Sequence, residues 1–142
     1  VRGIKLSQTD EVIGMLIAKR EGTVLVTSEN GFGKRSLLDA YRVQSRGGKG
    51  VYTMKKTTKT GQLVTILETT DEDDLMIITN AGVMIRQKVD LIRVIGRNTQ
   101  GVKLIRLDDG SKISSVTKVI NDPEDPHNNE QQDAESSEPE TE

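Results

Sequence analysis

The sequence predicts an all-β fold of the propeller class, built from repeats of about 50 residues with four strands in each. Three observations predict it: the chain matches itself at an offset of 51 residues, β-branched residues form short runs between turn signals, and helical periodicity is weak. A period near 50 residues is typical of arrays in which one repeat forms one blade. β-Branched enrichment, with no proline before residue 120, favours strands over helices.

The repeat is clearest between residues 31–55 and 82–106, where eight positions are identical without a gap. Residues 1–6 align in turn with residues 51–56, so the chain holds about two and a third repeats. Propeller arrays need more blades than this to close, and we expect the chain to be part of something longer. The identical pairs are Gly31/Gly82, Arg35/Arg86, Asp39/Asp90, Arg42/Arg93, Val43/Val94, Arg46/Arg97, Gly50/Gly101 and Val51/Val102.

The middle repeat shows its strands in order. Turn signals at Thr60-Gly61 and at Asn80-Ala81-Gly82 separate apolar, β-branched runs, and Glu29-Asn30-Gly31 is the matching hairpin turn one repeat earlier. The run at 75–79 is continuously apolar, which predicts a strand buried on both faces. We expect strands at Val51–Lys55, Leu63–Leu67 and Leu75–Thr79, with a fourth strand starting at Val83.

Two further segments of the body receive a structural interpretation. Residues 71–74 are four consecutive acids without the spacing of a calcium loop, so we expect a solvated turn and no metal site. Residues 37–43 can form one helical turn. We assign a structural role to the repeated Asp39 and Asp90, which can cap a turn or pair with Arg42 and Arg93.

Charge is divided unequally along the chain. Residues 1–120 hold all 20 basic residues and 13 of the 22 acidic ones, a net charge of +7, whereas residues 121–142 carry a net charge of −9. The last 22 residues contain no Val, Ile, Leu, Met or aromatic residue, so they have nothing to bury against the entropy of ordering. We therefore expect a folded body, 1–120, and a disordered acidic tail, 121–142, which either solubilises the protein or competes for its basic surface.

Several classes of function are excluded by composition. There is no cysteine, which excludes disulfides and thiolate metal sites, and the single histidine, His127, lies in the tail. No apolar run reaches the roughly 18 residues of a membrane span, and no signal peptide opens the chain, so we expect a cytoplasmic protein with no membrane partner. Tyr41 and Tyr52 are not in a nucleophile context, and we expect no catalytic residue in this segment.

The segments after the fourth strand carry cations at matching places in both repeats. Equivalent loops of a repeat array lie along one rim, so we expect a positive stripe that suits a linear polyanion. Glycines let backbone N–H groups approach phosphate, and arginine adds charge-assisted hydrogen bonds. Such contacts hold the backbone of double-stranded DNA without reading its bases. The predicted DNA-binding residues are Lys34, Arg35, Arg42, Arg46, Gly47, Gly48, Lys49, Arg86, Lys88, Arg93, Arg97 and Lys103.

One of these loops resembles a known motif. Gln44-Ser45-Arg46-Gly47-Gly48-Lys49-Gly50 resembles the box motif of the DNA gyrase A protein, whose pattern is Gln-Arg/Lys-Arg-Gly-Gly-Arg/Lys-Gly. Residues 29–35 and 95–102 resemble the last blades of that protein's C-terminal domain, and the resemblance covers nearly all of residues 1–120. Ser45 stands where the family has a basic residue, and the best copy of the box lies in the first blade of the family. We therefore interpret residues 44–50 as a later, degenerate copy.

The resemblance implies a β-pinwheel, a propeller variant whose blades exchange strands, here the last two blades and part of a third before an acidic tail. It implies a DNA-wrapping role in a type IIA topoisomerase that introduces negative supercoils into DNA with ATP. The implied partner is the gyrase B protein, which binds ATP and helps to bind Mg²⁺, in an A2B2 heterotetramer; the catalytic tyrosine belongs to an upstream domain.

Two alternatives to this interpretation stay open. Within the family's relatives, the C-terminal domain of the topoisomerase IV A protein has a degraded box or none. A protein-interaction β-propeller without a DNA role is the other alternative, and it predicts binding that is insensitive to salt.

Overall fold

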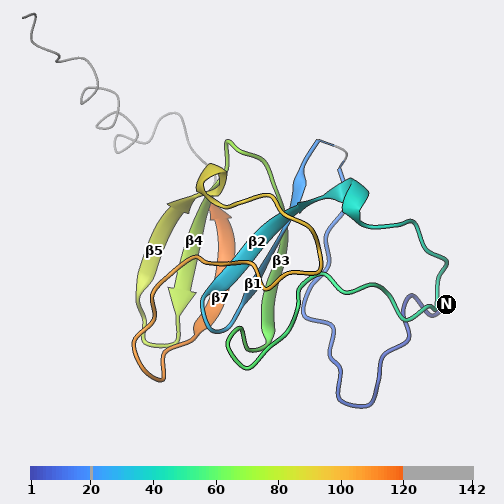
Figure 1. Ribbon diagram of the computed structural model, residues 1–142, viewed down its shortest axis with the longest axis horizontal. Helices are drawn as coiled ribbons and strands as arrows, with labels where there is room; N and C mark the ends of the chain where they lie inside the picture. The colour runs from blue at the N-terminus through green and yellow to red at the C-terminus, as the bar shows by residue number, and fades with distance from the viewer. Residues whose placement is uncertain (20, 120–142) are drawn as a thin grey trace, which may run out of the picture.

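The computed structural model describes residues 1–19 and 21–119, and these form two antiparallel β-sheets and two short 3-10 turns (Figure 1). The all-β prediction is therefore confirmed. The predicted disordered tail, 121–142, lies outside the described residues, as does His127. The strands are β1 (Thr23–Ser28), β2 (Phe32–Leu37), β3 (Leu63–Thr69), β4 (Asp74–Thr79), β5 (Met84–Lys88), β6 (Val102–Lys103) and β7 (Ile113–Val119), and the 3-10 turns are η1 (Leu38–Ala40) and η2 (Val89–Leu91).

Each sheet is built from more than one repeat. The first sheet has the order β3-β1-β2-β6: its hairpin β1–β2 comes from the first repeat, β3 from the second and β6 from the third. The second sheet has the order β5-β4-β7, in which β7 of the third repeat pairs with a hairpin of the second. Strand exchange between repeats is thus observed, as the resemblance implied. A sheet is not the four strands of a single repeat, because neighbouring repeats complete it.

The predicted strands and turns are mostly found where expected. β3 begins at Leu63 and runs two residues beyond the predicted end, and β4 begins one residue early. The two hairpin turns contain Gly31 at φ 89° and Gly82 at φ 81°, a backbone region that favours glycine. The expected helical turn is present as η1, and its counterpart η2 recurs 51 residues later, with Asp39 and Asp90 in equivalent positions.

The predicted strand at Val51–Lys55 is wrong. Its counterpart one repeat later forms β6, because Lys103 there faces Phe32 of β2. Within the described residues no strand stands opposite residues 51–55, and the Lys55 amide donates instead to the carbonyl of Thr99 at 2.9 Å. An isolated β-strand needs a neighbour for its hydrogen bonds, so the same sequence pattern forms a strand in one repeat and not in another.

The core lies between the two sheets and beneath the first one. β1, at the centre of the first sheet, is buried on both faces: Leu25 faces the inter-sheet core, and Val24 and Val26 pack with Met54 on the other side. The prediction of burial on both faces is wrong for β4, whose residues alternate between buried and half-buried. The inter-sheet core consists of Leu25, Leu75, Ile77, Val89, Ile92, Ile105, Ile113 and Val116.

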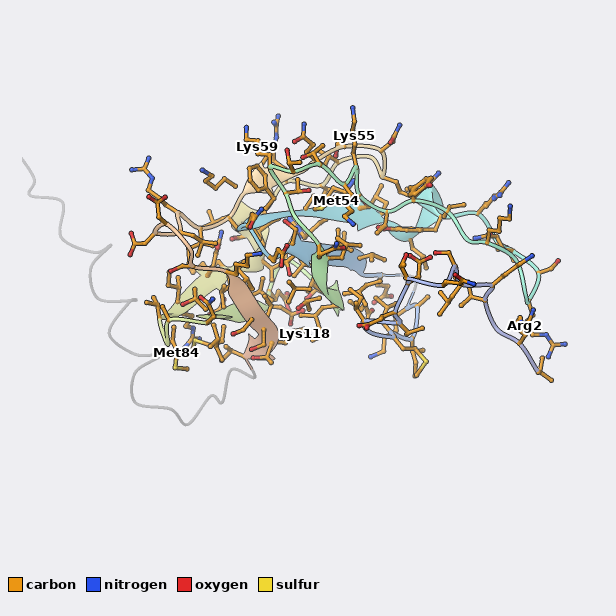
Figure 2. All side chains as sticks on the ribbon, turned by 90° about the horizontal axis from the view of Figure 1, so that it is seen from below. Arg2, Met54, Lys55, Lys59, Met84 and Lys118 are labelled. Carbon is orange, nitrogen blue, oxygen red and sulfur yellow. The ribbon has the colours of Figure 1, made fainter. Side chains whose placement is uncertain are left out.

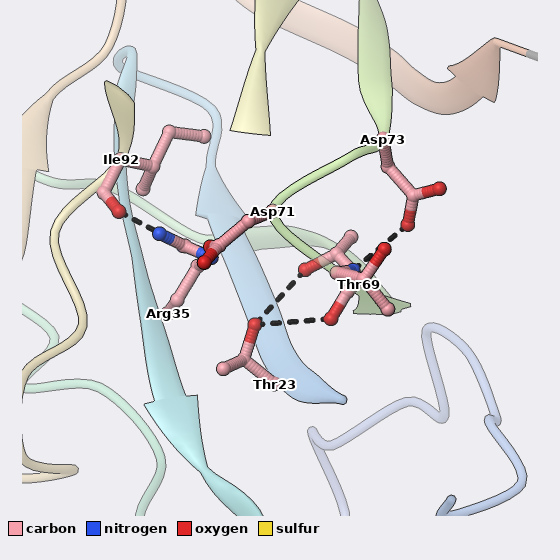
Figure 3. Close-up of polar contacts among 7 residues, drawn as sticks. Thr23, Arg35, Thr69, Asp71, Asp73 and Ile92 are labelled. Carbon is pink, nitrogen blue, oxygen red and sulfur yellow. Dashed lines mark hydrogen bonds and ion pairs between the residues drawn. The ribbon is translucent and has the colours of Figure 1, made fainter. Parts of the chain in front are cut away.

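The acidic turn between β3 and β4 is more than a solvated loop. The carboxylate of Asp71 pairs with Arg35 at 2.5 Å (Figure 3). The carboxylate of Asp74 pairs with Arg86 at 2.7 Å, and Asp73 accepts a hydrogen bond from the amide of Thr70 at 2.8 Å. Among the described residues, no three side chains of metal-binding type are grouped so that they could hold a metal ion. No helix in this part of the chain is long and apolar enough to cross a membrane.

Candidate nucleic-acid interface

Lys34, a predicted DNA contact, is fully buried in β2. Its ammonium donates to the carbonyl of Gly96 at 2.8 Å, to the carbonyl of Arg97, and to the hydroxyl of Thr99 at 3.2 Å. Burial, and secondarily the nearby charge of Arg97, lowers the pKa of Lys34 to about 8. The prediction that Lys34 contacts DNA is therefore wrong: the side chain holds the loop of the following repeat in place.

Arg35 is also buried, and its side chain contacts other parts of the protein instead of facing the DNA interface. Its Nε donates to the carbonyl of Ile92 at 2.8 Å, and its Nη1 pairs with the exposed carboxylate of Asp71 at 2.5 Å (Figure 3). The guanidinium thus joins β2 to η2 and to the acidic turn. The recurrence of an arginine at this position in both repeats predicts a DNA contact. In the first repeat, however, the Arg35 side chain contacts other parts of the protein.

The first glycine loop, residues 42–50, presents exposed cations from an ordered backbone. Arg42, Arg46 and Lys49 are exposed. The loop is held by residues near the start of the chain, because the Gly47 amide donates to the carbonyl of Gly3 at 2.9 Å and the Gly48 carbonyl accepts from the Lys5 amide at 2.8 Å. The Gly47 amide is therefore used within the protein and is not open to phosphate. The side chains of this loop, rather than that glycine amide, are suited to contact a polyanion.

The second loop, residues 96–101, is fastened to the base of the first. Arg97 is half-buried; its Nε donates to the carbonyl of Ala40, and its Nη1 donates to the carbonyl of Tyr52 at 2.6 Å. Its guanidinium also lies over the ring of Tyr41, 5.8 Å from the centroid. Ala40 and Tyr52 precede and follow the first loop, so Arg97 closes that loop at its base. This arrangement favours a positioning role for Arg97.

The remaining predicted cations are exposed, and they come from three parts of the chain. One group lies in the first glycine loop, a second lies around η2, and Lys103 lies in β6. The Arg93 carbonyl also accepts from the Arg35 amide at 3.0 Å. One of them, Arg86, is engaged by Asp74. The exposed set is Arg42, Arg46, Lys49, Arg86, Lys88, Arg93 and Lys103.

A third basic segment was missed by comparing repeats. Lys55, Lys56 and Lys59 are exposed on the turn that precedes β3, and Lys55 and Lys59 point away from the sheets on the same side of the molecule (Figure 2). This turn runs beside the second loop, since the Thr57 hydroxyl donates to Gln100 at 3.2 Å. The sequence signal was local: three lysines in five positions, which an alignment at an offset of 51 passes over because two of them do not recur.

The exchange of strands between consecutive repeats of this length defines a propeller of the pinwheel type. The family described as "DNA gyrase C-terminal domain, beta-propeller" matches residues 1–19, 22–70 and 73–120, and the last two segments begin 51 residues apart, which is the period found in the sequence. The chain belongs to this family.

Known proteins with similar sequences and structures agree with this assignment. The chain is 48% identical over 134 residues to the DNA gyrase A protein of Staphylococcus aureus (strain NCTC 8325 / PS 47), and the match covers 93% of this chain and 15% of that protein. A solved DNA gyrase A C-terminal domain superposes with a TM-score of 0.79 at 27% identity, covering 84% of this chain and 41% of the other. The C-terminal domain of a DNA topoisomerase IV has the same fold, with a TM-score of 0.76 at 21% identity over 84% of this chain and 38% of the other. The chain therefore spans about a seventh of the length of its curated relatives.

Proposed function

We propose that this chain is part of the DNA-wrapping domain of a DNA gyrase A protein and that it holds double-stranded DNA by its backbone. The observation that carries the proposal is a pair of exposed arginines, Arg42 and Arg93, which recur 51 residues apart just after η1 and η2. A repeated, exposed cation at the same place of each repeat fits an anion that extends along the array. Family membership supports the same conclusion.

In this proposal the buried cations and the exposed cations have different roles. Lys34, Arg35 and Arg97 fix the loops from within, and the exposed side chains of Arg42, Arg46 and Lys49 remain for phosphate. Loops that are already ordered lose little conformational freedom when they bind, which favours affinity. Contacts of this kind position DNA without reading its sequence.

The whole-protein context is part of the proposal. In it, residues 1–120 are the last blades of the domain and residues 121–142 an acidic extension, in a cytoplasmic type IIA topoisomerase that hydrolyses ATP. The gyrase B protein binds the ATP and helps to bind Mg²⁺ in an A2B2 assembly, and this chain contributes DNA positioning rather than a catalytic side chain.

Negative supercoiling of a relaxed plasmid tests this function. In the full-length gyrase A protein, combined with the gyrase B protein, ATP and Mg²⁺, deletion of this segment should abolish negative supercoiling. Arg42→Gln combined with Arg93→Gln should reduce it, whereas Arg42→Lys combined with Arg93→Lys, which keeps both charges, should retain most of it. Unchanged supercoiling after the deletion would contradict the proposal.

A topoisomerase IV protein remains the alternative within this fold, because the fold likeness extends to that enzyme. The sequence family and the identity to the gyrase A protein favour gyrase. The same plasmid assay separates the two: a topoisomerase IV context would leave the relaxed plasmid without negative supercoils.

A further inference from the structure

Phe32, the single phenylalanine of the chain, lies at the start of β2 with only 7% of its surface exposed. Two lysines from different repeats reach its ring: the ammonium of Lys59 lies 5.5 Å from the ring centroid, and that of Lys103 lies 5.8 Å from it. The negative face of an aromatic ring attracts cations at this distance. One ring therefore contacts two ammonium groups that come from different repeats.

Both lysines rise from ordered backbone. Lys103 belongs to β6 and faces Phe32 in the strand register. Lys59 lies in a turn closed by the buried side chain of Thr60, whose hydroxyl accepts from the Thr57 amide at 3.0 Å, and by the Gly61 amide, which donates to the Thr57 carbonyl at 3.0 Å. The two charges are thus fixed to parts of the first sheet and its adjoining turn rather than to a loose segment.

Two more exposed lysines, Lys55 and Lys56, lie on the same turn. Within residues 1–19 and 21–119, none of the four lysines takes part in an ion pair, and Glu29, which lines a hollow with Lys56, is already paired with Lys112 at 3.4 Å. We name this group the lysine platform; it consists of Lys55, Lys56, Lys59 and Lys103.

We propose that the lysine platform is a separate phosphate-binding station for double-stranded DNA, placed beside the second glycine loop. The backbone of the platform touches that loop, since the Lys55 amide donates to the carbonyl of Thr99 at 2.9 Å. It is not a copy of the repeated stations: the positions equivalent to Lys56 and Lys59 one repeat later are Leu107 and Gly110. This inference rests on the proposed function, because it names a further place where the same DNA is held.

The test is a titration of duplex DNA with the whole 142-residue chain at several salt concentrations, followed by fluorescence anisotropy. Each phosphate contact contributes about 0.9 to the negative log–log slope of affinity against salt. The double variant Lys59→Gln with Lys103→Gln should therefore flatten the slope by about 1.8. The matched control is Lys19→Gln with Lys118→Gln, which removes the same charge from exposed lysines that line a separate hollow with Glu21, Glu68 and Asp73, and it should leave the slope unchanged. Circular dichroism should show that all variants are folded.

The outcomes separate this inference from the proposed function. If the unmodified chain binds DNA and the platform variant keeps its slope while Arg46→Gln with Lys49→Gln flattens it, the platform is refuted and the proposed function stands. Equal flattening by the platform variant and by its control also refutes the platform, because the slope would then depend only on the total charge of the chain. If the unmodified chain does not bind DNA, both proposals fail.

Discussion

Gly101 ends the second glycine loop, at the position that matches the last glycine of the box-like motif. It has φ 77°, and a Cβ added to it would lie 2.5 Å from the carbonyl oxygen of Gly33 in β2. Gly82 has nearly the same φ, 81°, but a Cβ there would meet nothing within 4 Å. Gly101→Ala and Gly82→Ala therefore share the cost of backbone strain and differ in the packing cost.

The magnitudes follow from these two contributions. A left-handed backbone costs an alanine about 1–2 kcal/mol, and forcing a methyl group into a packed site adds about 1–3 kcal/mol. We expect Gly82→Ala to lower the free energy of unfolding by about 1–2 kcal/mol and Gly101→Ala to lower it by about 2–5 kcal/mol. The restriction of the unfolded chain is the same for both, so the difference reports the packing against Gly33.

Urea denaturation followed by circular dichroism measures both variants under the same conditions. The same result for the two variants would refute the conclusion that Gly101 is required for close approach of two repeats. A loss of DNA affinity in Gly101→Ala without a loss of stability would instead assign this glycine to phosphate contact.

Three further outcomes are expected. Leu75→Ala should lower the free energy of unfolding by about 2–5 kcal/mol in urea denaturation, because Leu75 is fully buried between the sheets; a cost below about 1 kcal/mol would contradict this core. The folded-state pKa of Lys34 is about 8 against an ordinary 10.5, so the unfolded chain binds more protons in that window and the free energy of unfolding should rise from pH 8 to pH 10.5. Lys34→Met should lose this rise, and an equal pH dependence of the two proteins would be inconsistent with the burial of a charged Lys34. Arg46→Gln with Lys49→Gln should flatten the salt dependence of DNA affinity by about 1.8, since both side chains are exposed; an unchanged slope would remove the first loop from the interface.

Most of the fold could be predicted from the sequence repeat and from the residues typical of turns. An offset of 51 residues and the glycines of two hairpin turns were enough to place β3 and β4 within two residues and to locate the turn of the β1–β2 hairpin. These signals did not predict which strands pair with which, because β6 and β7 complete sheets whose other strands come from earlier repeats. The missing strand at 51–55 has the same cause: a β-prone run shows its preference, but the strand that must lie beside it belongs to another part of the chain.

The sequence predicted that basic residues form the candidate site, but it did not predict which of them are exposed. Charge and recurrence identified Arg42 and Arg93 as exposed cations, but the same reasoning also selected Lys34 and Arg35, which are buried. A lone basic residue in a sequence does not reveal whether carbonyl groups of a neighbouring repeat surround it, as they do at Lys34. Of the lysine platform, only Lys103 was predicted as a DNA contact; Lys56 and Lys59 were missed because they do not recur one repeat later.

The measurement that tests the central claim most directly is the salt dependence of the chain's affinity for double-stranded DNA. With Arg42, Arg46 and Lys49 in contact with phosphate, the log–log slope should be about −2.7 or steeper. Duplexes of unrelated sequence should give the same slope and similar affinities, because the contacts reach only the backbone. A flat salt response, or no binding at low salt, would contradict the role of this chain in gripping DNA.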